Sequence, residues 1–394
     1  STVNDYTEKY YSNPHELDAF NWGYQSFFTE NGIRGEGVSY FDGALKNRQN
    51  LSKLNTEDKV VVQETFYDYQ GRPAVSVLPT PIDERTFKYR SGFNQNSSNQ
   101  EYTADDFDID NPTNPEMSTN SGASNYYSPL NPNQDGVNAY IPDAEEYPFT
   151  RTLYTNDLTG RVKSQGGLGA NHAIGSGHES TFYYGKPLQH KLTALFGTDV
   201  GFSKAYSETM VIDPNGQASV SVMDASGRVI ITNLAGNPPA NLEAIPSHLA
   251  KEQITASILD NTVDYQDGYG SLTTTQAYIS KAGGLHAFTY SLDPETYTEC
   301  LPQGVCYDCV YDLTISVKDV YTMAEMITNG PFVVTIGGNN PLNNTCENTL
   351  YNSPTNGELE VELPIGSYII TKTLEVNQAA IDYYADQYMN ESTC

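Results

Sequence analysis

Short runs of alternating apolar and polar residues, separated by turn-forming residues, extend along most of the chain. Over 61–82, two runs rich in Val and aromatic residues flank Asp68–Gly71, which predicts a β-hairpin. Further strand-like runs occupy 149–186, and residues 205–234 divide into three strands with a turn after each of the first two. This pattern predicts an all-β fold of mostly antiparallel hairpins with few short helices.

Two segments depart from this pattern. Residues 92–148 lose the periodicity and are dominated by Ser, Asn, Asp, Pro and Gly, which predicts a long polar surface insertion. A short helix is predicted at 187–197, where Pro187 begins and Gly197 ends a helical run.

Nearer the C-terminus, alternating strands with polar loops predict a small β-sandwich, and after Asn377 the period becomes helical. We expect this helix to lead into further chain. The predicted regions are 1–91 (β-rich), 92–148 (insertion), 149–300 (β-sheet region), 301–377 (Cys-containing β-sandwich) and 378–394 (helix).

The composition supports half-buried strands. Hydrophobic residues make up 38% of the chain, and 30 Tyr stand against 14 Phe and a single Trp. A tyrosine ring can pack on a strand face while its hydroxyl reaches water or a backbone group, so many short strands with one wet face are expected.

The charge excludes several classes of partner. Asp and Glu total 49 and Lys and Arg 21, which gives a net charge of −28. Such a surface repels nucleic-acid phosphates and anionic lipids, and no apolar run is long enough to span a membrane. The acidity is typical of a protein that must stay soluble outside the cell. The first residue is Ser rather than Met, so we expect a processed product.

The cysteines gather in the last quarter of the chain. Local disulfides in an oxidising compartment are the favoured interpretation, with one thiol left over. A zinc site on Cys306 and Cys309 is the alternative, although no second close pair or nearby His completes it. The disulfide candidates are Cys300, Cys306, Cys309 and Cys346, and Cys394 is the fifth cysteine.

Self-comparison reveals a repeated pattern, in which an Asp, a short turn, a Gly-Arg pair and an apolar strand follow one another. Asp can accept hydrogen bonds from turn amides, Gly can adopt a positive φ, and Arg begins the returning strand with its stem along an aromatic ring. The segment Tyr40–Gly43 matches the first half only. The turn residues are Asp68, Gly71, Arg72, Asp157, Gly160, Arg161, Asp224, Gly227 and Arg228.

These segments resemble the YD repeat of the RHS superfamily, which includes teneurins and Tc toxins. Residues 166–185 and 211–236 look similar to the N-terminal part of very large RHS-repeat proteins of Bacteroidetes-type bacteria, and residues 300–319 and 363–388 look similar to downstream parts of those proteins. The resemblance implies a secreted or cell-surface bacterial protein whose β-sheet ribbon encloses a cargo or polymorphic toxin. Its partners would be the remainder of a larger polypeptide or other surface proteins.

Several polar clusters are candidates for chemical sites. His172 and His178, with Ser176, Glu179 and Ser180, suggest a hydrolase-like group or a metal pair, but the segment lacks the final Gly of a nucleophile elbow. A Gly-rich loop between strands is therefore favoured.

Acidic loops offer weak candidates for structural calcium. Asp106, Asp108 and Asp110 would face one way in an extended chain, and the alternative is a solvated acidic loop. Asp264, Tyr265 and Asp267 suggest a calcium loop or a glycan platform, but a plain hairpin is favoured.

No motif points to catalysis or to an organic cofactor, so no catalytic residue is assigned and the chain is not predicted to be an enzyme. A glycoside hydrolase would need two carboxylates across a cleft, which spacing alone cannot reveal. The favoured function is a structural or encapsulation segment of a large RHS-type protein. The alternative is an extracellular module that binds a glycan or a protein partner.

Overall fold

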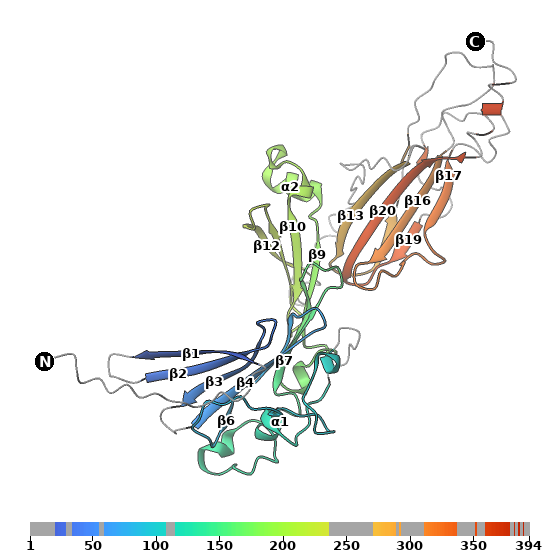
Figure 1. Ribbon diagram of the computed structural model, residues 1–394. Helices are drawn as coiled ribbons and strands as arrows, with labels where there is room; N and C mark the ends of the chain where they lie inside the picture. The colour runs from blue at the N-terminus through green and yellow to red at the C-terminus, as the bar shows by residue number, and fades with distance from the viewer. Residues whose placement is uncertain are drawn as a thin grey trace. The chain divides into compact units, whose positions relative to one another are not determined.

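The computed structural model describes residues 20–28, 34–54, 59–107, 115–235, 271–288, 291–292, 311–336, 351–352 and 359–378, together with Asp382, Ala385, Asp386 and Met389. The chain divides into two compact units (Figure 1). The first comprises residues 1–181 and 213–216, and the second comprises 182–212 and 217–394. The described parts of both units are built mainly from antiparallel strands, as the alternating pattern predicts.

The first unit is an antiparallel sheet in which consecutive strands are neighbours. The hydrogen-bonded order is β1 (Asn21–Phe28), β2 (Arg34–Phe41), β3 (Asn47–Leu54), β4 (Lys59–Tyr67), β5 (Pro73–Val77), β7 (Phe149–Tyr154) and β8 (Val162–Gly166). Strand β6 (Thr80–Ile82) pairs with the first half of β4, and β5 pairs with its end. The predicted hairpin over 61–82 is therefore confirmed.

Alternation along β4 separates the two faces of this sheet. Val60, Val62, Glu64 and Phe66 are buried, and the residues between them are half-buried. The buried face of β2–β4 packs in one apolar cluster with Tyr89. Glu64 is a buried carboxylate on this face, and the buried Gln49 of β3 lies directly opposite it.

The polar insertion contributes to the core, which its composition does not predict. Its described part contains the short helices η1 (Ala104–Phe107), α1 (Gly122–Tyr126) and η2 (Gly136–Tyr140). Phe107, Met117 and Ala123 are fully buried and pack in one cluster with Phe66 and Phe149. A few apolar residues suffice for this burial, because the surrounding Asn and Ser side chains bond to nearby backbone groups.

Strand β9 (Ser180–Gly185) begins in the first unit, where Ser180 and Thr181 pair with β8, and the short helix η3 (Ala170–His172) precedes it. In the second unit, β10 (Ser207–Ile212), β11 (Ala218–Met223) and β12 (Val229–Ala235) form a meander, which confirms the three strands predicted over 205–234. Helix α2 (Gln189–Phe196) confirms the helix predicted at 187–197, and η4 (Thr198–Val200) and η5 (Ser203–Ala205) follow it.

The second unit also contains a four-stranded sheet in the order β13 (Ser271–Ser280), β20 (Gly366–Val376), β16 (Tyr311–Asp319) and β17 (Phe332–Ile336). The pair β14 (Leu285–Phe288) and β19 (Leu359–Glu362) shares an apolar cluster with β16 and β20, which makes this module two-layered. A short pair, β15 (Ser291–Leu292) and β18 (Tyr351–Asn352), completes the described strands.

The boundary of this module differs from the predicted one at residue 301. Strand β13 lies before that residue, yet it pairs with β20 along all ten of its residues. The module therefore begins by Ser271, and a pairing between strands so far apart in sequence leaves no local signal. Gln378, Asp382, Ala385, Asp386 and Met389 are helical, in agreement with the predicted C-terminal helix. Within the described residues, no helix combines the length and the apolar character needed to span a membrane.

Candidate functional site

The turn between β4 and β5 contains the first of the predicted Asp–Gly–Arg sets. The backbone N–H of Asp68 donates to the carbonyl of Arg72 (2.9 Å), and that of Gly71 donates to the carbonyl of Asp68 (2.8 Å). The Asp68 Oδ1 accepts from the N–H groups of Gln70 and Arg72, and Arg72 Nε donates to Oδ2 at 2.7 Å. Gly71 has φ +72°, so the residue type matches the conformation.

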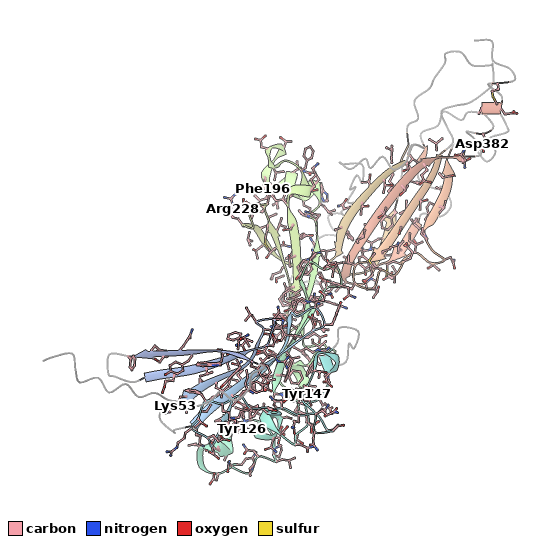
Figure 2. All side chains as sticks on the ribbon, viewed as in Figure 1. Lys53, Tyr126, Tyr147, Phe196, Arg228 and Asp382 are labelled. Atoms are coloured by element: carbon pink, nitrogen blue, oxygen red, sulfur yellow. The ribbon has the colours of Figure 1, made fainter. Side chains whose placement is uncertain are left out.

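The turn between β11 and β12 repeats this arrangement with the same partners. Asp224 N–H donates to the Arg228 carbonyl (2.9 Å), Oδ1 accepts from Ser226 and Arg228, and Arg228 Nε donates to Oδ2 at 2.8 Å. Gly227 has φ +77°. Arg228, labelled in Figure 2, differs from Arg72 in being exposed: 79% of its side chain is accessible, against 14% for Arg72.

The turn between β2 and β3 is a third copy, which the sequence matched only in part. Asp42 N–H donates to the Lys46 carbonyl (3.0 Å), and Oδ1 accepts from Ala44 and Lys46. Leu45, with φ +57°, takes the place of the glycine, and Lys46 takes that of the arginine. Gly43 is not the equivalent glycine. The useful signal is an Asp followed four residues later by a cation.

The turn between β7 and β8 is two residues longer. Here Thr155 N–H donates to the Arg161 carbonyl (2.8 Å), and Asp157 lies inside the loop. Burial raises the pKa of Asp157, but hydrogen bonds from Thr155, Thr159 and Arg161 outweigh it and hold the pKa far below its usual value. The three predicted sets therefore all close hairpins, one of them with a different register.

Each of these four hairpins also contains a register shift immediately before its turn, at Phe41, Tyr67, Tyr154 and Met223. A β-bulge increases the local twist and re-aims side chains. Turn and bulge together therefore form a repeated structural unit.

Contacts between tyrosines and cations join consecutive hairpins of the first unit. Tyr154 O–H donates to the Pro73 carbonyl (2.9 Å), and the Arg72 guanidinium lies 4.4 Å from the Tyr154 ring centroid. In the same way, Tyr67 O–H donates to the Asn47 carbonyl (2.8 Å), and Lys46 Nζ lies 5.8 Å from its ring centroid. The tyrosine of one hairpin thus rests on the cation of the preceding one.

The turn alone does not distinguish these units. Asn96 and Gln100 form the same hydrogen-bonded turn in the insertion, with Asn99 at φ +58° in the glycine position, but no cation follows. All four hairpins combine a turn with a bulge, and in the first unit tyrosine–cation contacts are added to them.

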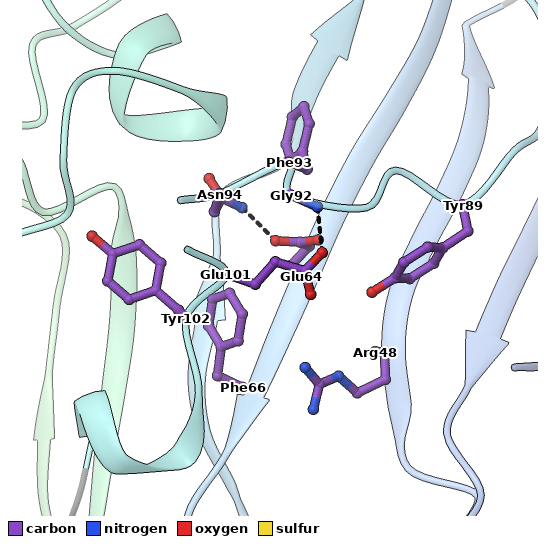
Figure 3. Close-up of a pocket in the computed structure, with 9 residues that line it drawn as sticks. All are labelled: Arg48, Glu64, Phe66, Tyr89, Gly92, Phe93, Asn94, Glu101 and Tyr102. Carbon is purple, nitrogen blue, oxygen red and sulfur yellow. Dashed lines mark hydrogen bonds between the residues drawn. The ribbon is translucent and has the colours of Figure 1, made fainter. Parts of the chain in front are cut away.

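A second constellation surrounds Glu64, which spacing did not reveal (Figure 3). Its two carboxylate oxygens accept hydrogen bonds from Gln49 Nε2 and Asn94 Nδ2, each at 2.7 Å. The other ends of these amides are also engaged, since Gln49 Oε1 accepts from Arg90 N–H and Asn94 Oδ1 accepts from Ala123 N–H. A carboxylate at an inward position of β4 was the available sequence signal.

The electrostatics of Glu64 are dominated by burial. Burial raises its pKa to about 7 against the opposing hydrogen bonds of Asn94 and Gln49, Glu101 adds to the rise, and Arg48 lowers it. The cavity beside it holds only about 10 Å³, which is room for one water at most. This cluster ties the insertion to the sheet and does not form a substrate site.

The His172–His178 loop has the hydrogen bonds of a structural loop. Ser176 Oγ donates to the Asn171 carbonyl rather than to a His, and Glu179 accepts from the backbone N–H groups of Gly175 and Gly177. His178 Nδ1 contacts the Pro214 carbonyl at 3.0 Å. These contacts do not assemble a nucleophile, a base and an acid.

The calcium and disulfide candidates are mostly outside the described residues. Asp106 Oδ2 accepts from the N–H and hydroxyl of Thr103, as in a turn. Within the described residues, no group of three His, Cys, Asp or Glu could hold a metal ion. The candidates outside the described residues are Asp108, Asp110, Asp264, Tyr265, Asp267, Cys300, Cys306, Cys309, Cys346 and Cys394.

Comparison with known proteins assigns no family. No protein-family model matches the chain, and no curated protein matches it.

Proposed function

We propose that the chain is a structural segment of a large exported β-repeat protein of the RHS type, which acts as a shell, plug or scaffold for a cargo or toxin. The observation that carries this proposal is the repeated hairpin unit. Three hairpins share the same Asp turn and a fourth has a longer one, all four contain a bulge, and tyrosine–cation contacts join three of them in sequence.

Repetition of this kind suits a structural role. When each unit contacts mainly its neighbours, stability is approximately a sum of unit and interface terms, and the sheet can extend by adding units. The Arg72 guanidinium contributes to the unit itself and to the interface between units, because it pairs with Asp68 in its own turn and stacks on Tyr154 of the next hairpin. The net charge of −28 keeps such a sheet soluble.

The first test is the mass of the native polypeptide, purified from its source without reduction. A mass far above the 43.4 kDa of this chain supports a shell or scaffold. A mass near that value overturns the proposal, because a chain of this size cannot enclose a cargo.

A second test uses the native particle. We call the joined hairpins β2–β3, β4–β5 and β7–β8 the hairpin ladder. Arg72→Ala should loosen this ladder and expose the enclosed segment to protease. Arg228→Ala alters the same kind of turn at an exposed position and should leave the protection unchanged. Equal protease protection in both variants and in the parent would contradict a role for the ladder in enclosing cargo.

A further inference from the structure

The face of β1–β4 opposite the buried cluster contains a groove of about 500 Å³, a volume within the range of small-molecule sites. Strand pairing sets two rows of residues across it. One row is Gln25, Gly37, Ser52 and Val61, and the other is Gly23, Ser39, Asn50 and Gln63. We call this surface the groove face.

The lining of the groove combines polar and apolar groups and includes no charged side chain. The residues that line it come from β1 to β4, together with Pro79. None of them is an Asp, Glu, Lys, Arg or His, although the chain has 49 acidic residues. A charged ligand would find no counter-ion here, so the ligand should be neutral.

Amides and hydroxyls on this face retain unused hydrogen-bonding groups. Asn50 Oδ1 accepts from Ser39 Oγ and Asn47 Nδ2, which directs Asn50 Nδ2 away from them, and that donor has no partner among the described residues. Gln63 bonds weakly through Nε2 to Ser76 (3.5 Å), and its Oε1 is likewise unmatched within the described part of the chain. An amide offers both a donor and an acceptor, which suits ligand hydroxyls.

Glycines and aromatic rings shape the groove. Gly23 and Gly37 lack a side chain on this face and so lower its floor. Phe41 lies at one end in contact distance of the Gly23 position. Towards the other end, Phe27 packs over Gly35, its partner in strand pairing, and remains 66% exposed. Exposed ring faces bind apolar C–H surfaces beside hydrogen-bonding groups.

We propose that the groove face binds a neutral oligosaccharide. Its hydroxyls would bond to Asn50, Gln63, Gln25 and Ser52, and its C–H faces would pack on Phe41. The backbone groups beneath are already paired between β1 and β4, so recognition falls to side chains. Sugar binding by the groove face does not rest on the scaffold function. A small native mass would contradict the scaffold function alone, and absence of sugar binding would contradict only the proposed groove ligand.

The test is isothermal titration calorimetry of the full chain with neutral tetrasaccharides of glucose, mannose and N-acetylglucosamine, and with a sulfated tetrasaccharide. We expect binding of at least one neutral sugar and none of the sulfated one. Gln63→Ala should weaken binding roughly three- to tenfold by removing one hydrogen bond. Ser52→Tyr, at an exposed position of the groove, should abolish it by filling the space.

Gln70→Ala is the matched control, because it makes the same change in the turn after β4, outside the groove lining. Fluorescence of Trp22, the single tryptophan of the chain, checks that β1 is intact in every variant. No binding of any neutral tetrasaccharide at millimolar concentration overturns the proposal. Preference for the sulfated sugar, or affinity unchanged by Ser52→Tyr, does so equally.

Discussion

At the scale of single residues, one aspartate side chain satisfies two backbone N–H groups at once in three of the hairpin turns. Asp68 and Asp224 each accept two backbone N–H groups and pair with the arginine four positions later. The chemistry of the two turns is the same, but their burial differs, because Arg72 is covered by Tyr154 and Arg228 is exposed. Burial should therefore decide what each arginine contributes to stability.

Arg72→Ala tests this directly. The substitution leaves the buried Asp68 carboxylate without its cation and removes the ring contact with Tyr154, so we expect the free energy of unfolding to fall by about 3 kcal/mol. Arg228→Ala, the matched control, should cause little change. Chemical denaturation followed by Trp22 fluorescence measures the stability of the Arg72→Ala variant, and denaturation followed by circular dichroism measures the stability of both variants. Equal losses would contradict the role of burial.

Leu45 occupies the glycine position of its turn at φ +57° and is 70% exposed. A non-glycine residue in this conformation costs about 1 kcal/mol or more, and little packing is lost on removing an exposed side chain. Leu45→Gly should therefore raise the free energy of unfolding by up to about 1 kcal/mol, less the entropy that glycine adds to the unfolded chain. Gly227→Ala, with open space around its β-carbon position, should lower it by a similar amount. A loss of stability in Leu45→Gly would contradict the conclusion that the Leu45 backbone is strained at this position.

Glu64 should make stability depend on pH in the acidic to neutral range. Its pKa is raised from 4.5 to about 7 by burial, so the folded protein holds this proton more tightly than the unfolded chain. Its contribution to stability is present below pH 4.5 and is lost as pH rises to 7, by about 3 kcal/mol.

The measurement is the free energy of unfolding at several pH values for the parent and for Glu64→Gln, which has no titrating group. The difference between the two curves isolates Glu64 from the other carboxylates. A difference that is constant with pH, or a parent that gains stability relative to the variant as pH rises, would refute the raised pKa.

At the scale of elements, the tyrosine hydroxyl joins one hairpin to the next. Tyr154→Phe removes the hydrogen bond to the Pro73 carbonyl and keeps the ring over Arg72, so a loss of about 1 kcal/mol is expected in thermal or chemical unfolding. Tyr140→Phe, at a residue that is 88% exposed, should leave stability unchanged. If the two variants behave alike, the hydroxyl does not couple the hairpins.

Local sequence patterns predicted the elements that local chemistry determines. Alternation located β4 and β10–β12, and turn residues located the hairpins that follow Tyr67 and Met223. The turn at Asp42 was matched only in part, because Leu45 adopts a conformation that its residue type disfavours. The Glu64 cluster was missed because its partners, Gln49 and Asn94, are brought together only by strand pairing and by the fold of the insertion.

At the scale of the whole molecule, each unit has a core of its own. Met117 belongs to the buried cluster of the insertion and sheet in the first unit, and Leu313 belongs to the β16–β20 cluster in the second. Compact units with separate cores are expected to unfold in separate transitions. The single tryptophan, Trp22, lies in the first unit, so its fluorescence reports that unit selectively.

Met117→Ala and Leu313→Ala form a matched pair, since both side chains are 1% exposed and each truncation should cost about 2–5 kcal/mol. We expect Met117→Ala to lower the transition temperature seen by Trp22 fluorescence and to leave a second calorimetric transition in place. Leu313→Ala should lower the temperature of the second calorimetric transition and leave the transition seen by Trp22 fluorescence in place. The two outcomes follow because a cavity destabilises only the cooperative unit that contains it. If either substitution shifts both transitions together, the chain unfolds as one unit, and the hairpin ladder of the first unit cannot be treated as an independently stable element.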